Sequence, residues 1–352
     1  MSVVLDRRPA PPSVPGPRSE GVWQAAWRRL RRDRVGMVSM AVVVFFVVLI
    51  VLSAGGLLGR DWQREVGVPS APPHFVGPAP ASEAAAIEGP KGPNADISDV
   101  DPLAPRYREW EERAARYKTA ETPKAETLPF GGDRLGRDVL AKALKGTQTS
   151  VFVGLLAASV ATLIGTLLGA LGGFFGGKLG DFLEWLYNVF TSIPEILLLL
   201  CFAAVFGRGI GSVAIILALV GWTGLYRQVR AEFLKHSVRD YVRSAEAIGA
   251  STASRMFRHI LPNVSHVILV RMSLLVVGFI KFEVILSYLG LGVGVDDVSW
   301  GTMLAEAQSE LILGHWWQLG AATAFMAVFV TAFSLFTDAL RDALDPRLRG
   351  LE

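Results

Sequence analysis

The stretch RSAEAIGASTASRMFRHILP occupies residues 243–262 and closes a polar interruption between two long hydrophobic segments. This interruption begins at Arg227 and carries seven Lys or Arg residues against three acids. In a membrane protein, an excess of basic residues is typical of a loop that faces the cytoplasm. The sequence therefore predicts a cytoplasmic loop over residues 227–262, held between membrane-spanning helices.

The composition is also that of a membrane protein. Of the 352 residues, 51% are apolar and only 19% are charged, and the mean hydropathy is +0.39. Because about 20 apolar residues cross the hydrocarbon core as a helix, we expect an all-α polytopic membrane protein with six transmembrane helices. The expected spans are 35–59, 146–177, about 182–207, 209–226, about 262–289 and 311–337.

Charge at the two ends of the chain indicates its orientation. Five arginines lie within residues 28–34, directly before the first span, and three follow the sixth, whereas residues 290–314 hold four acids and no Lys or Arg. Both termini are therefore expected in the cytoplasm. The expected parts are a cytoplasmic tail with an interfacial helix (1–34), the first transmembrane helix (35–59), an extracytoplasmic segment (60–145) with one short amphipathic helix near residues 105–119, a five-helix core (146–340) that contains the loop 227–262, and a cytoplasmic tail (341–352).

The sequence contains no motif for catalysis, for a metal or for a cofactor. Residues 172–178 fit the GxxxxGK pattern of a phosphate-binding loop, but Leu179 stands where that loop needs Ser or Thr, and a membrane helix precedes it instead of a strand. The five histidines are scattered, and neither HExxH nor GxSxG occurs. The basic residues lie at the ends of spans, which argues against binding of nucleic acid. We expect a transport subunit, not an enzyme.

Two ionisable residues lie deep in the expected spans and are candidates for a translocation path. Glu195 follows Pro194, which should kink the third span, and Arg271 lies in the fifth. A charge at mid-bilayer costs ~2.5–3.5 kcal/mol on insertion scales, so such residues usually serve a function. Glu195 is expected to face a wet pore, or to pair with Arg271 or with another subunit. Lys281 and Glu283 are expected to reach the outer interface.

Glycine is frequent in the second span, where Gly165 and Gly169 form a GxxxG pair. Small residues allow helix backbones to approach each other closely in lipid, where apolar side chains give no drive for association. The pattern favours packing within the helix bundle, and an interface with a partner subunit is the alternative.

Turn and interface residues predict the outer side of the chain. Gly131 to Asp133 suit a turn and a helix N-cap, so a helix is expected from Arg134 to Leu144 along the outer membrane face. The glycines of residues 290–294 should end the fifth span. Trp300, Trp316 and Trp317 suit the interface belt.

The loop at residues 243–262 resembles the cytoplasmic coupling loop of ABC importer permeases. That loop reads Glu-Ala-Ala, three residues, Gly, nine residues, a hydrophobic position, one residue and Leu-Pro. The resemblance implies short helices that dock into a groove of an ATPase subunit. The residues implied in this coupling are Arg243, Ser244, Ala245, Glu246, Gly249, His259, Leu261 and Pro262.

Three of these positions depart from the family pattern. Arg243 stands in place of the Glu, Ser244 in place of the first Ala, and His259 at the hydrophobic position. The reversed charge at Arg243 implies ATPases that differ locally from the common kind. Alternatively, Glu246 supplies the acid, because residues three apart lie on the same side of a helix.

Three further stretches are similar to signatures of dipeptide/oligopeptide permeases of the C-type subunit. Residues 132–140 (GDRLGRDVL) resemble G-T-D-x-L-G-R-D-V-L, residues 286–304 resemble L-S-F-L-G-L-G followed by S-W-G-x-M-L, and residues 341–349 match R-D-A-L-D-P-R-L-R. The resemblance thus covers residues 131–349. Its signature positions include Asp133, Leu135, Gly136, Arg137, Asp138, Gly290, Gly292, Trp300 and Gly301.

This resemblance implies the type I ABC importer permease fold in a bacterial cytoplasmic (inner) membrane. It implies a heterodimer with a B-type permease in the lipid bilayer, two cytoplasmic ATPase subunits and an extracytoplasmic substrate-binding protein. The implied function is import of peptides by alternating access, driven by ATP hydrolysis on the ATPases. Nickel chelates are an alternative substrate. A stand-alone secondary transporter or channel is the alternative of another class, and the large basic loop and the absence of an inverted repeat argue against it.

Overall fold

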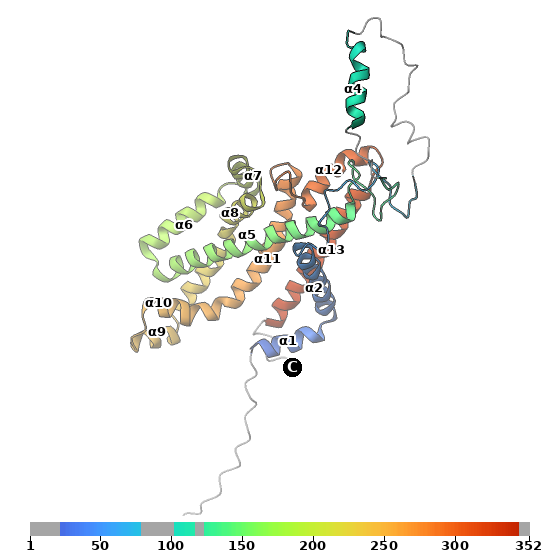
Figure 1. Ribbon diagram of the computed structural model, residues 1–352. Helices are drawn as coiled ribbons and strands as arrows, with labels where there is room; N and C mark the ends of the chain where they lie inside the picture. Colours follow the sequence, from blue (N-terminus) through green and yellow to red (C-terminus); the bar gives the residue numbers. More distant parts are fainter. Residues whose placement is uncertain (1–21, 79–101, 117–122, 345–352) are drawn as a thin grey trace, which may run out of the picture.

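The computed structural model describes residues 22–78, 102–116 and 123–344 (Figure 1). The start of the expected N-terminal tail, part of the extracytoplasmic segment and most of the C-terminal tail lie outside these ranges. The described chain is helical, with only isolated β-bridges between its loops. Its helices are α1 (Val22–Arg32), α2 (Arg34–Ala54), α4 (Ala104–Arg116), α5 (Val139–Phe175), α6 (Gly177–Thr191), α7 (Glu195–Phe206), α8 (Ile210–Ser237), α9 (Asp240–Ala247), α10 (Thr252–Ser254), the π-helical turn η1 (Arg255–Ile260), α11 (Leu261–Tyr288), α12 (Trp300–Ile312) and α13 (Trp317–Leu344).

Four helices of the described chain, α2, α5, α8 and α13, are long and apolar enough to cross a membrane. The pair α6 and α7 makes a fifth candidate, and its two halves are bent by 87° at residues 192–194. The kink expected at Pro194 is therefore present as a full break. The expected fifth span coincides with α11, which is 28 residues long but is not among these candidates. Six spans remain a prediction.

The prediction of a separate helix from Arg134 to Leu144 is wrong, because residues 134–138 are not helical and residues 139–144 are the start of α5. Asp138 is the N-cap, and its carboxylate accepts the backbone N–H of Leu140 at 2.8 Å. Asp133 instead closes the preceding turn by accepting the N–H groups of Leu135 and Arg137. From Val139 onward, one continuous helix of 37 residues runs to Phe175.

Glycines join α5 to α8. A Cβ atom on Gly165, Gly169 or Gly173 would lie 2.6–2.8 Å from backbone carbonyl oxygens of α8, so a larger residue at any of them would push the two helices apart. The GxxxG pair is thus used within this chain, as the bundle interpretation predicts. The main apolar core extends from this pair to α7 and α11, and it includes Phe46 of α2 and Phe329 of α13.

Three residues expected at the outer interface are buried instead. Glu283 is 0% exposed, and its carboxylate accepts a hydrogen bond from the Ser287 hydroxyl at 2.7 Å, because α5 and α12 cover this end of α11. Trp300 is also fully buried, in the core between α12 and α13. Trp316 is half-exposed, in agreement with an interface position, whereas the indole of Trp317 is buried and donates to the carbonyl of Gly132.

The helices expected at the cytoplasmic side lie toward one end of the molecule. Figure 1 shows α1, α9 and α10 toward its lower end, and α4 and α12 toward its upper end. Helix α1 packs against α13 through Leu30, Ala339 and Ala343. The upper end also contains the loops at residues 60–78 and 123–138, which pair through short bridges such as Gly67 with Ala125.

Candidate functional site

The expected coupling loop folds as a bent pair of short helices. Because α8 continues to Ser237, the first third of the predicted loop 227–262 is part of a long helix. The remaining residues, 238–260, form what we call the elbow: α9, a turn at Gly249, and then α10 and η1, which lead directly into α11.

Gly249 ends α9 in a left-handed conformation, with φ of +87°. Its N–H donates to the carbonyl of Glu246, and the N–H of Ala250 donates to the carbonyl of Ala245, both at 2.9 Å. These two bonds form a Schellman cap, which strongly favours glycine at this position. No atom lies within 4 Å of the place where a Cβ would sit, so the backbone conformation alone demands the glycine.

The second half of the elbow contains a π-helical turn just before Leu261 and Pro262. The N–H of Leu261 donates to the carbonyl of Met256, five residues earlier. Proline has no N–H, and its ring clashes with the carbonyl four residues before it. A wider turn relieves that clash, and such turns are frequent at functional sites. His259 is half-buried in this turn, and its carbonyl accepts from the side chain of Asn263.

The inner face of the elbow is fixed to the ends of α5 and α8. Val242 and Ala245 of α9, and Met256 and Ile260 of η1, are all less than 5% exposed. Val242, Met256 and Ile260 pack with Ala170 of α5 and with other apolar side chains, which are Val229 and Phe233 of α8 and Val264 of α11. A force applied to the elbow therefore acts directly on three long helices.

An ion pair closes the elbow across its bend. The Nη1 atom of Arg255 lies 2.5 Å from Oε1 of Glu246, and the guanidinium also covers the ring of Phe174 at 5.4 Å. Glu246 is thus already paired within the chain. Its role as the substitute docking acid for Arg243 is not supported by this arrangement.

The outer face of the elbow is exposed and carries positive charge. Arg243 and Ser244 of α9 are exposed, and so is Arg258 of η1. The apolar tip is formed by Ile248, which is 86% exposed, and by Phe257. Exposed apolar side chains accompanied by exposed arginines suit a partner groove with acidic edges.

The two intramembrane candidates lie near one another. Glu195 is exposed at the first position of α7, directly after the break between α6 and α7. The guanidinium of Arg271 extends from α11 over Gly224 of α8, where a Cβ would meet its Nη2 at 2.6 Å. Arg271 lies close enough to act electrostatically on the Glu195 carboxylate. A negative and a positive side chain thus lie within electrostatic range of each other at the break between α6 and α7.

Residues 161–350 match the family of binding-protein-dependent transport system inner membrane components. This match covers more than half of the chain, including the elbow. The chain belongs to this family. It is therefore a multi-pass inner-membrane component of an ABC transport system. Residues 21–64 also match the N-terminal TM domain of oligopeptide transport permease C.

Two proteins similar to this chain are named as peptide permeases. The oligopeptide transport system permease protein OppC of Bacillus subtilis is 33% identical over 70% of this chain and 81% of its own length. The dipeptide transport system permease protein DppC of the same organism is 29% identical over 93% of this chain and 86% of its own length. Among solved structures, an inward-facing MetNI methionine ABC transporter is 16% identical over 58% of this chain and 96% of its own, with a TM-score of 0.48.

The first signature of the permease surrounds a buried ionic network. Oδ2 of Asp133 accepts Nε of Arg137 at 2.6 Å and Nζ of Lys142 at 2.7 Å. Lys142 also contacts Glu306 of α12 at 2.5 Å and Gln318 of α13 at 3.2 Å. The network therefore joins the turn before α5 to α12 and α13. Leu135 is exposed beside it.

Burial and charge shift the pKa of two carboxyl groups here in opposite directions. Burial alone would raise the pKa of Asp133, but Lys142 and Arg137 hold it below its usual value. The pKa of Glu310 is raised by burial, which outweighs the N–H of Arg134 that its Oε1 accepts at 2.9 Å. Asp133 is thus held ionised, and Glu310 is biased toward its neutral form.

Close backbone approach explains the glycines of the signatures. Gly136 faces the carbonyl of Gly67, and Gly292 faces Ser287, so a Cβ at either place would overlap its neighbour. Gly301 would meet the carbonyl of Val284 at 2.5 Å. Gly290 follows the end of α11 with φ of +77°. These positions hold α11 against α12 and the outer loop against α5.

Sequence reasoning missed Lys142, Glu306, Gln318 and Arg255 as site residues. One signal was available for Lys142, because a lysine within the run that opens α5 must find a partner or leave the membrane. Arg255 had no comparable signal. Its partner Glu246 is nine residues away, across a bend that the sequence alone does not specify.

Proposed function

We propose that this chain is the C-type permease subunit of an ABC importer for peptides. It pairs with a B-type permease, receives substrate from an extracytoplasmic binding protein, and is driven by two ATPases on the cytoplasmic side. Membership of the transport family supports the class of function. The names of the relatives, which are dipeptide and oligopeptide permeases, support the substrate class.

The observation that carries the proposal is the elbow. Its inner face is buried against α5 and α8, and its outer face presents Arg243, Ile248 and Phe257 to a partner. A stand-alone channel or secondary transporter does not need an exposed docking surface of this kind for an ATPase. An ATPase groove that holds Ile248 would move the attached helices as it opens and closes.

The translocation path is proposed to run beside the break between α6 and α7. A peptide has a terminal ammonium and a terminal carboxylate, and Glu195 and Arg271 offer the two opposite charges. The free helix ends at residues 192–195 add polar backbone groups to the same place. Movement of α8 and α11 by the elbow would expose this site to each side of the membrane in turn.

The proposed orientation places the elbow and both termini in the cytoplasm. Its basis is the excess of Lys and Arg in residues 227–262 and beside the first and last spans. The grouping of α1 with α9 and α10 at one end of the molecule supports the same orientation (Figure 1).

Gly249→Val tests the proposal. Valine is strained at φ of +87°, so the Schellman cap should open and the elbow should lose its shape. Gly249→Asn is the matched control, because asparagine tolerates this conformation. We expect Gly249→Val to insert normally and to retain the B-type subunit, but to lose co-purifying ATPase and peptide-stimulated ATP hydrolysis in proteoliposomes. Gly249→Asn should keep most of both.

The alternatives give different results in the same experiment. Wild-type peptide uptake by Gly249→Val would refute the role of the elbow. Purification of the wild-type chain without any ATPase subunit would instead favour a stand-alone transporter.

A further inference from the structure

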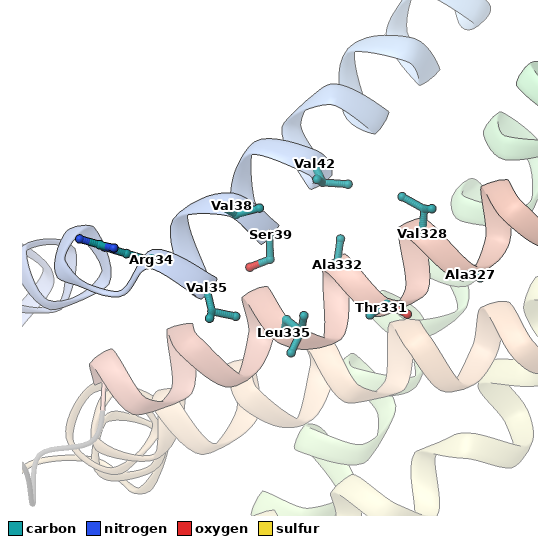
Figure 2. Close-up of a pocket in the computed structure, with 10 residues that line it drawn as sticks. All are labelled: Arg34, Val35, Val38, Ser39, Val42, Ala327, Val328, Thr331, Ala332 and Leu335. Atoms are coloured by element: carbon teal, nitrogen blue, oxygen red, sulfur yellow. The ribbon is translucent and has the colours of Figure 1, made fainter.

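An open apolar groove runs between α2 and α13 on the surface of the bundle (Figure 2). Its volume is about 660 Å³. Its walls are formed mainly by Val35, Val38 and Val42 of α2 and by Val328, Ala332 and Leu335 of α13. Several of these side chains remain exposed, including Val38 at 66% and Val328 at 51%.

The one charged residue in the lining of the groove, Arg34, lies at one end. Figure 2 shows Arg34 at that end, beyond Val35. Within the described residues, the side chain of Arg34 has no hydrogen-bond or ion-pair partner. The hydroxyl of Ser39, on the wall, donates to the carbonyl of Gly36 at 3.0 Å and so has no need of a ligand. The groove therefore offers one cation at its mouth and mainly hydrocarbon along its length, with Thr331 as the other polar residue of its walls.

Further positive charge lies next to Arg34 along the chain, with Asp33 as the one acid among it. Helix α1 ends beside Arg34 with Arg29, Arg31 and Arg32 in its last turn. Arg31 lies over the ring of Trp27 at 4.9 Å, which is the pairing of a basic and an aromatic side chain common at a membrane surface. An occupant with a negative group at this end is favoured.

The length of the groove fits one leaflet. From Val35 to Val42, and from Val328 to Leu335, each wall extends seven residues, or about 10 Å along a helix axis. One leaflet of the hydrocarbon core is about 15 Å deep. A helix of a partner subunit would cross both leaflets and would need a seam about twice as long. An acyl chain that enters from the surface ends near the middle of the membrane.

We propose that the groove between α2 and α13 binds one anionic phospholipid from the leaflet on the side of α1, with its phosphate at Arg34 and an acyl chain along Val38 and Val328. This inference goes beyond the proposed transport function and does not depend on it. The bound lipid fills the space between the first and last long helices. It thereby holds α2 against the core.

The test uses the full-length chain, purified in detergent with the subunits that co-purify and then stripped of loose lipid. Phosphatidylglycerol and phosphatidylethanolamine with the same acyl chains are titrated separately, with retained lipid measured by native mass spectrometry and stability by thermal unfolding. Val38→Trp and Val328→Trp fill the groove from exposed positions, so neither should disturb folding. Val44→Trp is the matched control, since Val44 is 53% exposed on α2 but does not line the groove.

We expect the wild type and Val44→Trp to retain phosphatidylglycerol tightly and to gain thermal stability from it, whereas both groove variants lose the tight lipid. Arg34→Gln should bind phosphatidylglycerol about fivefold more weakly. Equal retention in Val328→Trp and the wild type would overturn the site. Equal binding of both lipids would overturn the assignment of the headgroup to Arg34. Efficient disulfide cross-linking of Val38→Cys to a co-purifying permease subunit would show that protein, not lipid, fills the groove.

Discussion

The Nζ atom of Lys142 lies 2.7 Å from Oδ2 of Asp133, and neither side chain is reached by solvent. Because Lys142 also contacts Glu306 and Gln318, a single ammonium holds together the turn before α5 and the helices α12 and α13. The outer layer of the molecule therefore depends on a buried pair that comes from the first signature stretch.

Replacement of Lys142 by methionine should destabilise the protein strongly. The variant keeps the apolar stem but leaves the Asp133 carboxylate buried with one cation fewer, and removal of one partner of a buried pair commonly costs about 3–5 kcal/mol. We expect a clear fall in thermal unfolding temperature in detergent. The control Lys145→Met removes a partly exposed ammonium that bonds to Gln148, and it should change stability much less. A similar loss in both variants would contradict the importance of the network.

A fall in pH should remove the stability contributed by Asp133 and reduce the destabilisation caused by burial of Glu310. The pKa of Asp133 is held low, so its stabilisation is present above its usual value and is lost as pH falls below about 4. The pKa of Glu310 is raised, so the folded state gains stability as pH falls toward about 4.3. We expect the deficit of Asp133→Asn relative to wild type to shrink below about pH 4. Glu310→Gln should match or exceed the wild type at pH 7 and lose that advantage near pH 4. Unfolding temperatures between pH 3 and pH 7.5 check both variants, and parallel curves would refute the assignments.

Reversal of charge at Arg243 should weaken assembly with the ATPase. The elbow presents Arg243 outward, while Glu246 is occupied by Arg255, so the cognate groove is expected to carry an acid opposite Arg243. Loss of a desolvated charge pair costs about 2–5 kcal/mol, whereas an exposed pair contributes only about 0–1 kcal/mol. We expect Arg243→Glu to reduce ATPase retention in pull-downs. Lys178→Glu, the same charge reversal at an exposed residue that is not part of the elbow, should not. Unchanged retention and salt sensitivity in Arg243→Glu would confine the contact to the region of Gly249.

Glu195 should recognise the terminal ammonium of a peptide. A hydrogen bond to a charged group contributes about 1.5–3 kcal/mol, so Glu195→Gln should lower uptake by tenfold or more. The wild type should discriminate against an N-acetylated peptide, and Glu195→Gln should not. Thr191→Val is a suitable control at the same break, because the Thr191 hydroxyl bonds only to carbonyls of its own helix. Equal discrimination by the wild type and Glu195→Gln would remove Glu195 from the path.

Thiol labelling tests the orientation. In a Cys201→Ala background, cysteine is introduced at Ser251 in the elbow or at Val76 in the outer loop, and both positions are exposed. An impermeant maleimide applied to intact spheroplasts should label position 76 and spare position 251, which should react only after lysis. Labelling at position 251 alone would reverse the topology.

Local rules were enough to predict much of the fold. Apolar runs predicted the long helices α2, α5, α8 and α13, and Pro194 predicted the break before α7. Gly165 and Gly169 predicted a close helix contact, although the partner helix α8 could not be named. The amphipathic stretch expected near residues 105–119 is helical up to Arg116, as α4, and its last three residues lie outside the described ranges. Each of these features is decided within one or two turns of the chain.

The errors arose where distant parts of the chain decide the outcome. Asp133 was read as a helix cap because its main partner, Lys142, lies beyond the true cap at Asp138. Glu283 was expected to reach the interface, but α5 and α12 cover it. Trp300 is likewise expected at the interface from its sequence context, but it is buried against Phe329 of α13. Sequence spacing reports which face of a helix a residue occupies, and only the packed structure reports what lies against that face.

Helix α5 connects the elbow to the ionic network around Lys142. Its 37 residues span about 55 Å, with Lys142 near one end and Phe174, under Arg255 of the elbow, near the other. A rod of this length is a lever, since a tilt of about 5° displaces its far end by about 5 Å. A single rotation of α5 would move the elbow and the Lys142 network together, and no relay of side chains is required between them. Stiffness of this helix, more than any single contact along it, would set how faithfully each nucleotide cycle is converted into opening of the gate.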